Sequence, residues 1–271
     1  MLTIFTLPKP FTDPHIRTIQ RNAIQSWKKL GPEVEVILMG KDSGIAETAK
    51  EFGVRYVADV AVNEFGTPLL DSAFDIAQKI ARHGRLMYVN ADVIFIADLI
   101  AALDKLPKES MLTVVRRIDL DVKEWMDFND QSWARKISDE ARNHGSLHSW
   151  AGIDYFIFNK GRFISLPPFA VGRVGWDNWV VHESRHRLRY TIDATACITA
   201  IHQNHGYSGN NAGTQRKTNP EAQKNSSFTK KPAQSYTIED ANWKLGPSGL
   251  KRNYLYSLPH LKRSLKLIWK R

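Results

Sequence analysis

Cysteine is almost absent from this sequence, which has a single one, Cys197, among its 271 residues. One cysteine cannot form an internal disulfide and cannot build a cysteine-rich zinc site. Cys197 lies in the apolar stretch TACITAI, which favours the role of a small buried hydrophobic residue. This low cysteine content is compatible with a reducing compartment.

Long hydrophobic runs are absent as well. No apolar stretch approaches the roughly 20 residues that a transmembrane helix needs. The first residues, MLTIFTLPKPF, are typical of a strand that enters a loop and not of a signal peptide. We therefore expect a cytoplasmic protein.

Residues 1–214 also lack a net charge, because their 25 basic and 25 acidic side chains cancel. The formal net charge of +10 belongs to residues 215–271, which hold 13 basic and 3 acidic side chains. A nucleic-acid-binding domain usually carries its basic surface on the fold itself. We therefore expect no nucleic-acid partner. A non-enzymatic nucleic-acid-binding module is an alternative that would explain the basic tail but not the polar motifs described below.

The first 110 residues alternate between apolar strands and helices. The expected strands are 2–7, 34–40, 54–59 and 86–95, and the expected helices are 15–29, 43–52 and 69–82. Such alternation predicts an α/β fold with a mostly parallel central sheet and helices on both faces.

The rest of the chain changes character. The expected strands there are 111–118, 149–161 and 190–202, and a helix is expected to begin within 167–184. Residues 203–231 are rich in Asn, Gly, Ser, Thr and Lys, which predicts a mobile segment. We therefore predict one domain over 1–214, followed over 215–271 by a mobile loop and a basic C-terminal helix.

The most informative segment is the apolar run 86–95, which the polar triplet Asn90-Ala91-Asp92 interrupts. Open α/β sheets bind their ligands at the carboxyl ends of parallel strands, where this triplet would lie. Asp92 is either the cap of a turn or helix or an oxygen ligand for Mg²⁺ or Mn²⁺. The apolar residues that follow favour the metal, because a strand seldom buries a lone carboxylate without a partner.

At this triplet the sequence resembles the GT-A family of nucleotide-sugar glycosyltransferases, whose signature is an Asp-x-Asp triplet after an apolar strand. Asn90-Ala91-Asp92 is similar to the Asn-x-Asp form of that signature. The resemblance implies a GT-A, Rossmann-like fold, a nucleotide-diphosphate-sugar donor and a divalent metal on its diphosphate. It also implies that Asp92 binds the metal, while Asn90, followed by Ala91, contacts the ribose or a metal-bound water.

The resemblance extends to the neighbouring loops. It implies that the loop Thr6-Leu7-Pro8-Lys9 holds the base and ribose, and that Thr67, in the loop 65–68, shapes the donor pocket. It divides the domain 1–214 into a nucleotide-sugar half at about 1–110 and an acceptor half at about 111–214.

Two histidines, His202 and His205, follow the last expected strand. They are either surface imidazoles or, as the resemblance implies, residues that complete the metal shell. His202 continues directly from the strand and is the preferred ligand. Because imidazole binds Mn²⁺ readily while Mg²⁺ prefers oxygen, we expect Mn²⁺ to be favoured over Mg²⁺.

A third group of residues lies in the segment GRVGWDNW, residues 172–179. Asp177 stands at an expected helix start, where it can be an N-cap; the resemblance implies the catalytic base of an inverting enzyme at such a place. Trp176 suits the apolar face of a sugar ring, and Arg173 can pair with a phosphate or an acidic acceptor. Asp154, within the strand 149–161, either orients the donor sugar or acceptor or is buried opposite Arg173.

The last segment, Leu258–Arg271, gathers apolar side chains on one side of a helical wheel and basic ones on a flank. Such a helix either packs on the domain or lies on an anionic membrane surface. The absence of acidic residues after Ser248 favours the membrane, with the protein peripheral on its inner face. The acceptor would then be a glycan or a lipid-linked molecule, as in surface polysaccharide assembly.

These features predict a metal-dependent glycosyltransferase, which is inverting if Asp177 is the base. A nucleotidyltransferase that makes a nucleotide-sugar is the alternative, because it would share the sheet and the metal. That alternative requires a glycine-rich basic loop after the first strand to hold a triphosphate, and LPKPF contains no glycine.

Overall fold

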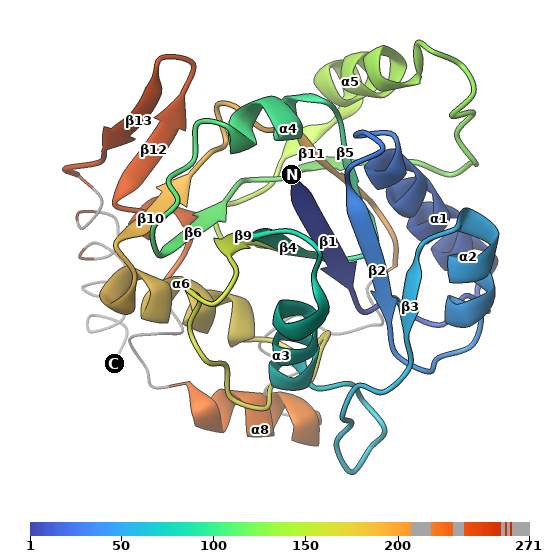
Figure 1. Cartoon of the computed structure of the whole chain (residues 1–271), viewed down its shortest axis with the longest axis horizontal. Helices are drawn as coiled ribbons and strands as arrows, with labels where there is room; N and C mark the ends of the chain where they lie inside the picture. Colours follow the sequence, from blue (N-terminus) through green and yellow to red (C-terminus); the bar gives the residue numbers. More distant parts are fainter. Residues whose placement is uncertain (207–217, 230–235, 256–257, 259–260, 262–271) are drawn as a thin grey trace.

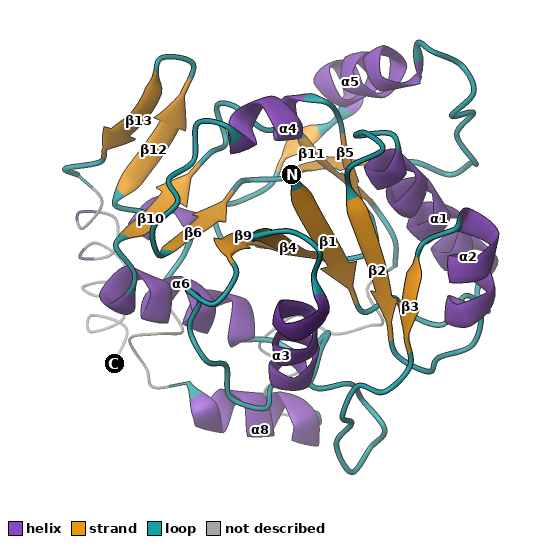
Figure 2. Ribbon diagram, in the orientation of Figure 1, coloured by secondary structure: helices purple, strands orange, loops and turns teal. Residues whose placement is uncertain are grey.

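The structure is a computed structural model that describes residues 1–206, 218–229, 236–255, 258 and 261 (Figure 1). Nine strands of the described chain form a central sheet in the order β13-β12-β10-β6-β9-β4-β1-β2-β3 (Figure 2). Five of the eight neighbouring pairs are parallel, namely β3–β2, β2–β1, β1–β4, β6–β10 and β10–β12. The strands are β1 (Leu2–Thr6), β2 (Glu35–Met39), β3 (Arg55–Val57), β4 (Arg85–Val89), β6 (Met111–Val114), β9 (Tyr155–Asn159), β10 (Tyr190–Asp193), β12 (Trp243–Gly246) and β13 (Gly249–Arg252).

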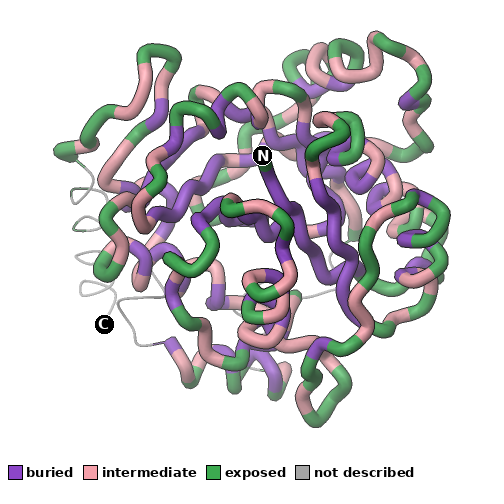
Figure 3. The backbone as a smooth tube through the Cα atoms, in the orientation of Figure 1, coloured by how far each residue is buried: buried purple, intermediate pink, exposed green. Residues whose placement is uncertain are grey.

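Successive side chains of each strand point to opposite faces of the sheet. Because apolar side chains lie on both faces, helices cover both. On one face, Leu2, Met87 and neighbouring strand residues pack against α1 (Pro14–Lys28), α2 (Ile45–Phe52) and α4 (Asp98–Leu103). On the other face, Phe5, Tyr88 and their neighbours pack against α3 (Leu70–Ile80) and α6 (Trp176–Arg187). Figure 3 shows the buried backbone concentrated in the central strands. The predicted fold class, α/β with a mostly parallel sheet between helices, is confirmed.

A second, four-stranded sheet explains why the expected strand 86–95 is interrupted. The chain leaves the central sheet at the end of β4 and enters the second sheet at β5 (Val93–Phe95), so residues 90–92 form the passage between them. The other strands of this sheet are β11 (Ala200–Gln203), β7 (Ile118–Leu120) and β8 (Ser146–Leu147). Helix α5 (Trp133–His144) packs on it through Ile137 and Ala141.

The described residues beyond 214 differ from the expected mobile loop. Helix α8 (Pro220–Phe228) and the 3-10 turn η2 (Ile238–Asp240) are formed, and the hairpin β12–β13 extends the central sheet through the parallel pair β10–β12. The polar composition of this segment predicted a loop. However, α8 has a good helix start, because the Asn219 side chain accepts a hydrogen bond from the Ala222 N–H and Pro220 occupies the first turn. The expected helix Leu258–Arg271 lies outside the described residues, apart from positions 258 and 261.

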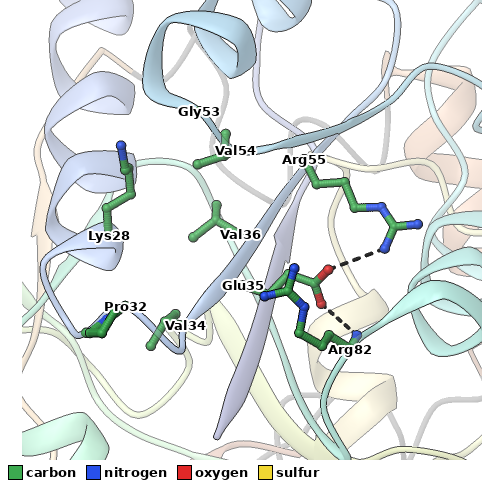
Figure 4. A pocket seen from close by; sticks show the side chains of 10 residues that line it. Lys28, Pro32, Val34, Glu35, Val36, Gly53, Val54, Arg55 and Arg82 are labelled. Atoms are coloured by element: carbon green, nitrogen blue, oxygen red, sulfur yellow. Dashed lines mark hydrogen bonds and ion pairs between the residues drawn. The ribbon is translucent and has the colours of Figure 1, made fainter.

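At the amino ends of the first strands, a buried carboxylate joins three segments of the chain (Figure 4). Glu35 accepts hydrogen bonds from the Thr3 hydroxyl and the Arg82 backbone N–H, both at 2.7 Å, and from the Arg55 guanidinium at 3.3 Å. These contacts hold the amino-terminal ends of the strands together, away from the carboxyl ends where the polar triplet lies. Within the described residues, no helix has the length and apolar character needed to cross a membrane.

Candidate active site

A cavity of about 600 Å³ opens at the carboxyl ends of β1 and β4. Its walls and floor come from segments that are far apart in the sequence. The lining residues are Leu7, Pro8, Lys9, Pro10, Ile16, Ile19, Gln20, Asp42, Phe65, Gly66, Thr67, Pro68, Asn90, Ala91, Asp92, Asp154, Val171, Gly172, Arg173, His202, His205 and Gly206. Most of the residues predicted from the sequence to bind donor or metal therefore share one cavity.

Three possible metal ligands meet on the floor of this cavity. Atoms of Asp92, His202 and His205 all lie within 4.8 Å of one another. Asp92 Oδ2 lies 3.1 Å from His205 Nε2 and 3.9 Å from His202 Nε2. Asp92 Oδ1 is buried and has no hydrogen-bond partner among the described residues. Burial would raise the pKa of Asp92, but the hydrogen bond with His205 and the adjacent His202 outweigh it and hold that pKa below its ordinary value.

Strand pairing explains why these residues meet. Strands β5 and β11 are antiparallel with His202 opposite Val93, the residue after Asp92. The buried Gln203 tightens this junction, because its side-chain amide donates to the backbone carbonyls of Asp92 at 3.1 Å and Ile19 at 2.7 Å. The second sheet therefore positions the histidines beside the triplet.

A carboxylate lies beside the Nδ1 edge of the His202 ring. Strands β7 and β11 are parallel with Asp119 beside His202, and Asp119 Oδ1 lies 3.3 Å from His202 Nδ1. His202 is 2% exposed, and burial lowers its pKa below the ordinary value, which favours the neutral imidazole. With its proton on Nδ1 facing Asp119, the ring presents the Nε2 lone pair to Asp92, as in carboxylate–histidine–metal arrangements.

Asp154 also lines the cavity, and its partner differs from the residue considered in the sequence. Arg117, which is 5% exposed, pairs with Asp154 Oδ2, while Asn90 Nδ2 donates to Asp154 Oδ1 at 3.0 Å. Arg173 instead pairs with Glu221. The alternative that Asp154 is buried opposite Arg173 is therefore wrong.

The loop after β1 is held in place by a buried glutamine. Gln20, on α1, accepts a hydrogen bond from the Lys9 backbone N–H at 2.7 Å and donates to the Lys9 carbonyl at 2.9 Å. Both backbone groups of Lys9 are thus fixed, and its Nζ lies 3.5 Å from His205 Nε2. Leu7, Pro8 and Lys9 line the cavity as expected, whereas Thr6 does not, because it is fully buried within β1.

The opposite wall consists of two segments joined by backbone hydrogen bonds. Val171 N–H donates to Pro68 O at 3.0 Å, and Leu70 N–H donates to Phe169 O at 2.9 Å. Thr67 and Arg173 both belong to this wall. The wall rests on α8, whose Glu221 accepts hydrogen bonds from Arg173 Nε at 2.8 Å and from Asn63 Nδ2 at 2.7 Å.

The two residues predicted at the start of α6 do not line this cavity. Trp176 is 6% exposed and packs against Tyr88 and Phe156, with ring centroids 5.4 and 5.0 Å apart. Its predicted contact with a sugar ring is therefore wrong, because the ring faces the core. Asp177 lies in the first turn of α6, but the cap residue is Gly175, with φ of 100°, and no side chain caps the helix. Asp177 is therefore not the N-cap.

Sequence reasoning missed the residues that support the site. Asp119 lies on the short strand β7 and Arg117 immediately precedes that strand; the alternating charged residues in RRIDLD were the signal that one face of this segment is polar. Glu221 had no such signal, because it lies in a segment whose composition is typical of a loop.

Comparison with known proteins gives matches among solved structures only. No protein-family model matches the chain, and no curated protein matches it. TarS residues 1–349 from S. aureus give a TM-score of 0.47 and 11% identity, over 74% of this chain and 60% of the TarS chain. A protein described as a nucleotide-diphospho-sugar transferase from Desulfovibrio desulfuricans G20 gives 0.46 and 13%, over 84% and 96%. Glucosyl-3-phosphoglycerate synthase from Mycobacterium tuberculosis, solved with Mn²⁺, UDP and glucosyl-3-phosphoglycerate, gives 0.45 and 16%, over 76% and 73%. The likeness concerns the fold.

Proposed function

We propose that the chain is a metal-dependent glycosyltransferase, which transfers a sugar from a nucleotide-diphosphate-sugar to a hydroxyl group of an acceptor. The observation that carries this proposal is the cluster Asp92, His202 and His205 on the floor of a cavity walled by the loops 7–10 and 65–68. The volume of about 600 Å³ lies within the range of small-molecule sites, about 300–1,000 Å³.

The donor atoms of the cluster fit a divalent cation. Asp92 has a buried oxygen without a hydrogen-bond partner in the described chain, and burial lowers the pKa of His202, which favours the neutral imidazole that metal binding requires. When bound there, a divalent ion would neutralise the charge of a diphosphate leaving group. One carboxylate with two imidazoles suits Mn²⁺ better than Mg²⁺. We therefore keep the preference for Mn²⁺ as a prediction.

The other lining residues are proposed to orient the donor. Lys9 Nζ, beside His205, adds a positive charge for the diphosphate. Asn90 and Ala91 lie at the strand end where the ribose would be contacted, and Asp154 can accept a hydrogen bond from a sugar hydroxyl, since Arg117 and Asn90 hold its carboxylate in the wall. Thr67 and Arg173 are proposed to contact the donor sugar or the acceptor.

Asp177 is the proposed base. It lies in the first turn of α6, and Arg173, four residues earlier, lines the cavity. In this reaction the acceptor hydroxyl attacks the anomeric carbon as its proton passes to Asp177, and the bond to the diphosphate breaks on the far face. The product would have inverted configuration.

Thermal stability in the presence of nucleotide-sugars tests the proposal. With Mn²⁺ present, a donor at 100 times its Kd should stabilise the wild type by about 2.7 kcal/mol. Asp92→Asn, which removes the charge but little volume, should lose this metal-dependent stabilisation, whereas Asp121→Asn, at an exposed position directly after β7, should keep it. If no nucleotide-sugar stabilises the wild type, or only a nucleoside triphosphate does, the glycosyltransferase proposal is wrong.

A further inference from the structure

Helix α8 supports one wall of the cavity through two buried side chains. Asn225, which is 1% exposed, accepts from the Ala170 N–H at 2.9 Å and donates to the Ala170 carbonyl at 3.0 Å, as a neighbouring strand would. Glu221, which is 6% exposed, lies one turn earlier on the helix. The wall segments 65–68 and 171–173 are therefore backed by a part of the chain that begins only after residue 214.

Glu221 contacts both wall segments with one carboxylate. Oε1 accepts from Asn63 Nδ2 at 2.7 Å, and Oε2 accepts from Arg173 Nε at 2.8 Å and from Arg173 Nη2. The Asn63 side chain in turn accepts from the backbone N–H of Thr67 at 3.0 Å. Removing the carboxylate would release the Arg173 guanidinium and the turn 63–67 together.

The Arg173–Glu221 contact orients a group that faces the cavity. A guanidinium has five N–H donors in a rigid plane, and Glu221 engages the edge formed by Nε and Nη2. The Nη1 donors keep a fixed direction as a result. The Arg173 side chain is 30% exposed and that of Glu221 is 7% exposed. Such a part-buried ion pair is weak evidence for stability, because desolvation and solvent screening offset much of its attraction, so an effect on geometry is the better explanation here.

We propose that Glu221 is a positioning residue for the donor cavity, which holds Arg173 and the 63–67 turn in the arrangement that binds the nucleotide-sugar. This inference rests on the proposed function, and Glu221 itself does not line the cavity. Its effect on the donor passes through Arg173 and the turn.

The chain provides a matched control on the same helix. Lys224 pairs with Glu64 at 3.1 Å, and so also links α8 to the turn 63–67. Both side chains of that pair are about half exposed, and neither lines the cavity. An exposed pair of this kind contributes little, so Lys224→Ala should behave as the wild type.

A double-mutant cycle tests the proposal with Glu221→Ala, Arg173→Ala and the double variant, measuring nucleotide-sugar and Mn²⁺ affinities separately. Glu221→Ala should weaken donor binding by about 10-fold, and the loss in the double variant should be clearly smaller than the product of the two single losses, because part of the effect of Glu221 passes through Arg173 and part through the turn. Mn²⁺ affinity should be unchanged. Additive losses, an equal loss of Mn²⁺ affinity, or normal donor binding by Glu221→Ala would overturn the proposal.

A second measurement needs no substrate. Phenylglyoxal should label Arg173 faster in Glu221→Ala than in the wild type or Lys224→Ala, as followed by mass spectrometry. Glu221→Gln, which keeps the shape and one acceptor oxygen, replaces the alanine variant in both assays if that variant does not fold. If the wild type binds no nucleotide-sugar, the proposed function fails, and unchanged labelling would separately refute the hold on Arg173.

Discussion

Asp119 offers a sharp test of the metal centre, because it touches a proposed ligand without being one. We predict that Asp119→Asn lowers Mn²⁺ affinity by about 10- to 100-fold, the usual effect of losing a residue that orients a metal-bound histidine. The substitution leaves the shape of the side chain and removes its charge. In the wild type the carboxylate lies 3.3 Å from His202 Nδ1, and a proton on that nitrogen would leave the Nε2 lone pair for the metal beside Asp92.

The magnitude follows from the environment of the pair. The side chain of His202 is 2% exposed and that of Asp119 is 18% exposed, so water screens the interaction between the imidazole and the carboxylate only weakly. A hydrogen bond to a charged acceptor contributes about 1.5–3 kcal/mol, against about 1 kcal/mol for a neutral pair. The expected difference of about 0.5–2 kcal/mol overlaps at its upper end with the free energy of a 10- to 100-fold change, about 1.4–2.7 kcal/mol.

Isothermal titration of Mn²⁺ into the metal-free protein provides the measurement, performed well below the unfolding temperature. That condition matters because Asp119 also accepts from Arg117 Nε at 2.8 Å and contacts His148 at 2.5 Å, so the variant will lose some stability as well. Asp121→Asn is the control. It removes the same charge two residues away, at an exposed side chain that accepts from Asn204 Nδ2 at 2.8 Å.

The outcome separates two explanations of the buried network. If Mn²⁺ affinity falls for Asp119→Asn but not for Asp121→Asn, the result supports a metal centre in which Asp119 orients the ligand His202. Equal falls for both variants would indicate a general electrostatic effect on the cation. If Asp119→Asn only lowers the unfolding temperature and binds Mn²⁺ like the wild type, then Asp119 and His202 form a structural pair, and His202 is not a metal ligand.

Two other predictions concern catalysis and pH. Asp177→Asn should lower turnover by about 10²- to 10⁴-fold with little change in donor affinity, since the amide cannot take the proton; equal losses of stability and turnover would show a structural role. Burial lowers the pKa of His202, so the imidazole of the unfolded chain binds a proton more readily than that of the folded one. The free energy of unfolding should therefore be unaffected by this group above about pH 6.5. It should decrease as the pH falls below that value toward the folded pKa. Thermal unfolding of the metal-free protein should show this slope, at most about 1.4 kcal/mol per pH unit, and His202→Gln should reduce it; an unchanged slope would mean that His202 is not the group responsible.

The sequence predicted the central sheet well because its strands carry their signal locally. Buried parallel strands are short apolar runs between helices with an apolar stripe, and α1 and α3 end within two residues of the expected limits. The same local signal misled at Trp176. A tryptophan beside a polar loop is equally compatible with a sugar platform and with the core, and only the packing of α6 against Tyr88 decides between them.

The residues missed by the sequence share a different property, since their roles depend on contacts distant along the chain. Glu221 lies 48 residues from Arg173 and 158 from Asn63. Asp119 meets His202 only through the register of β7 and β11. Periodicity and spacing describe neighbours along the chain, so they could identify Asp92 and His202 as polar residues at strand ends, but not the residues that orient them.

The arrangement of the two sheets gives a physical reason for the place of the polar triplet. A strand that continued straight from β4 would carry residues 90–95 along the central sheet, away from β11. Because the chain crosses into the second sheet at residues 90–92, Asp92 comes next to the β5–β11 pair, and antiparallel pairing then sets His202 opposite Val93. His205, three residues further on, reaches Asp92 Oδ2 at 3.1 Å from the chain that leaves β11. The proposed metal centre is therefore a consequence of the crossing between sheets, and any substitution that lets β5 slip by one residue against β11 would separate its ligands.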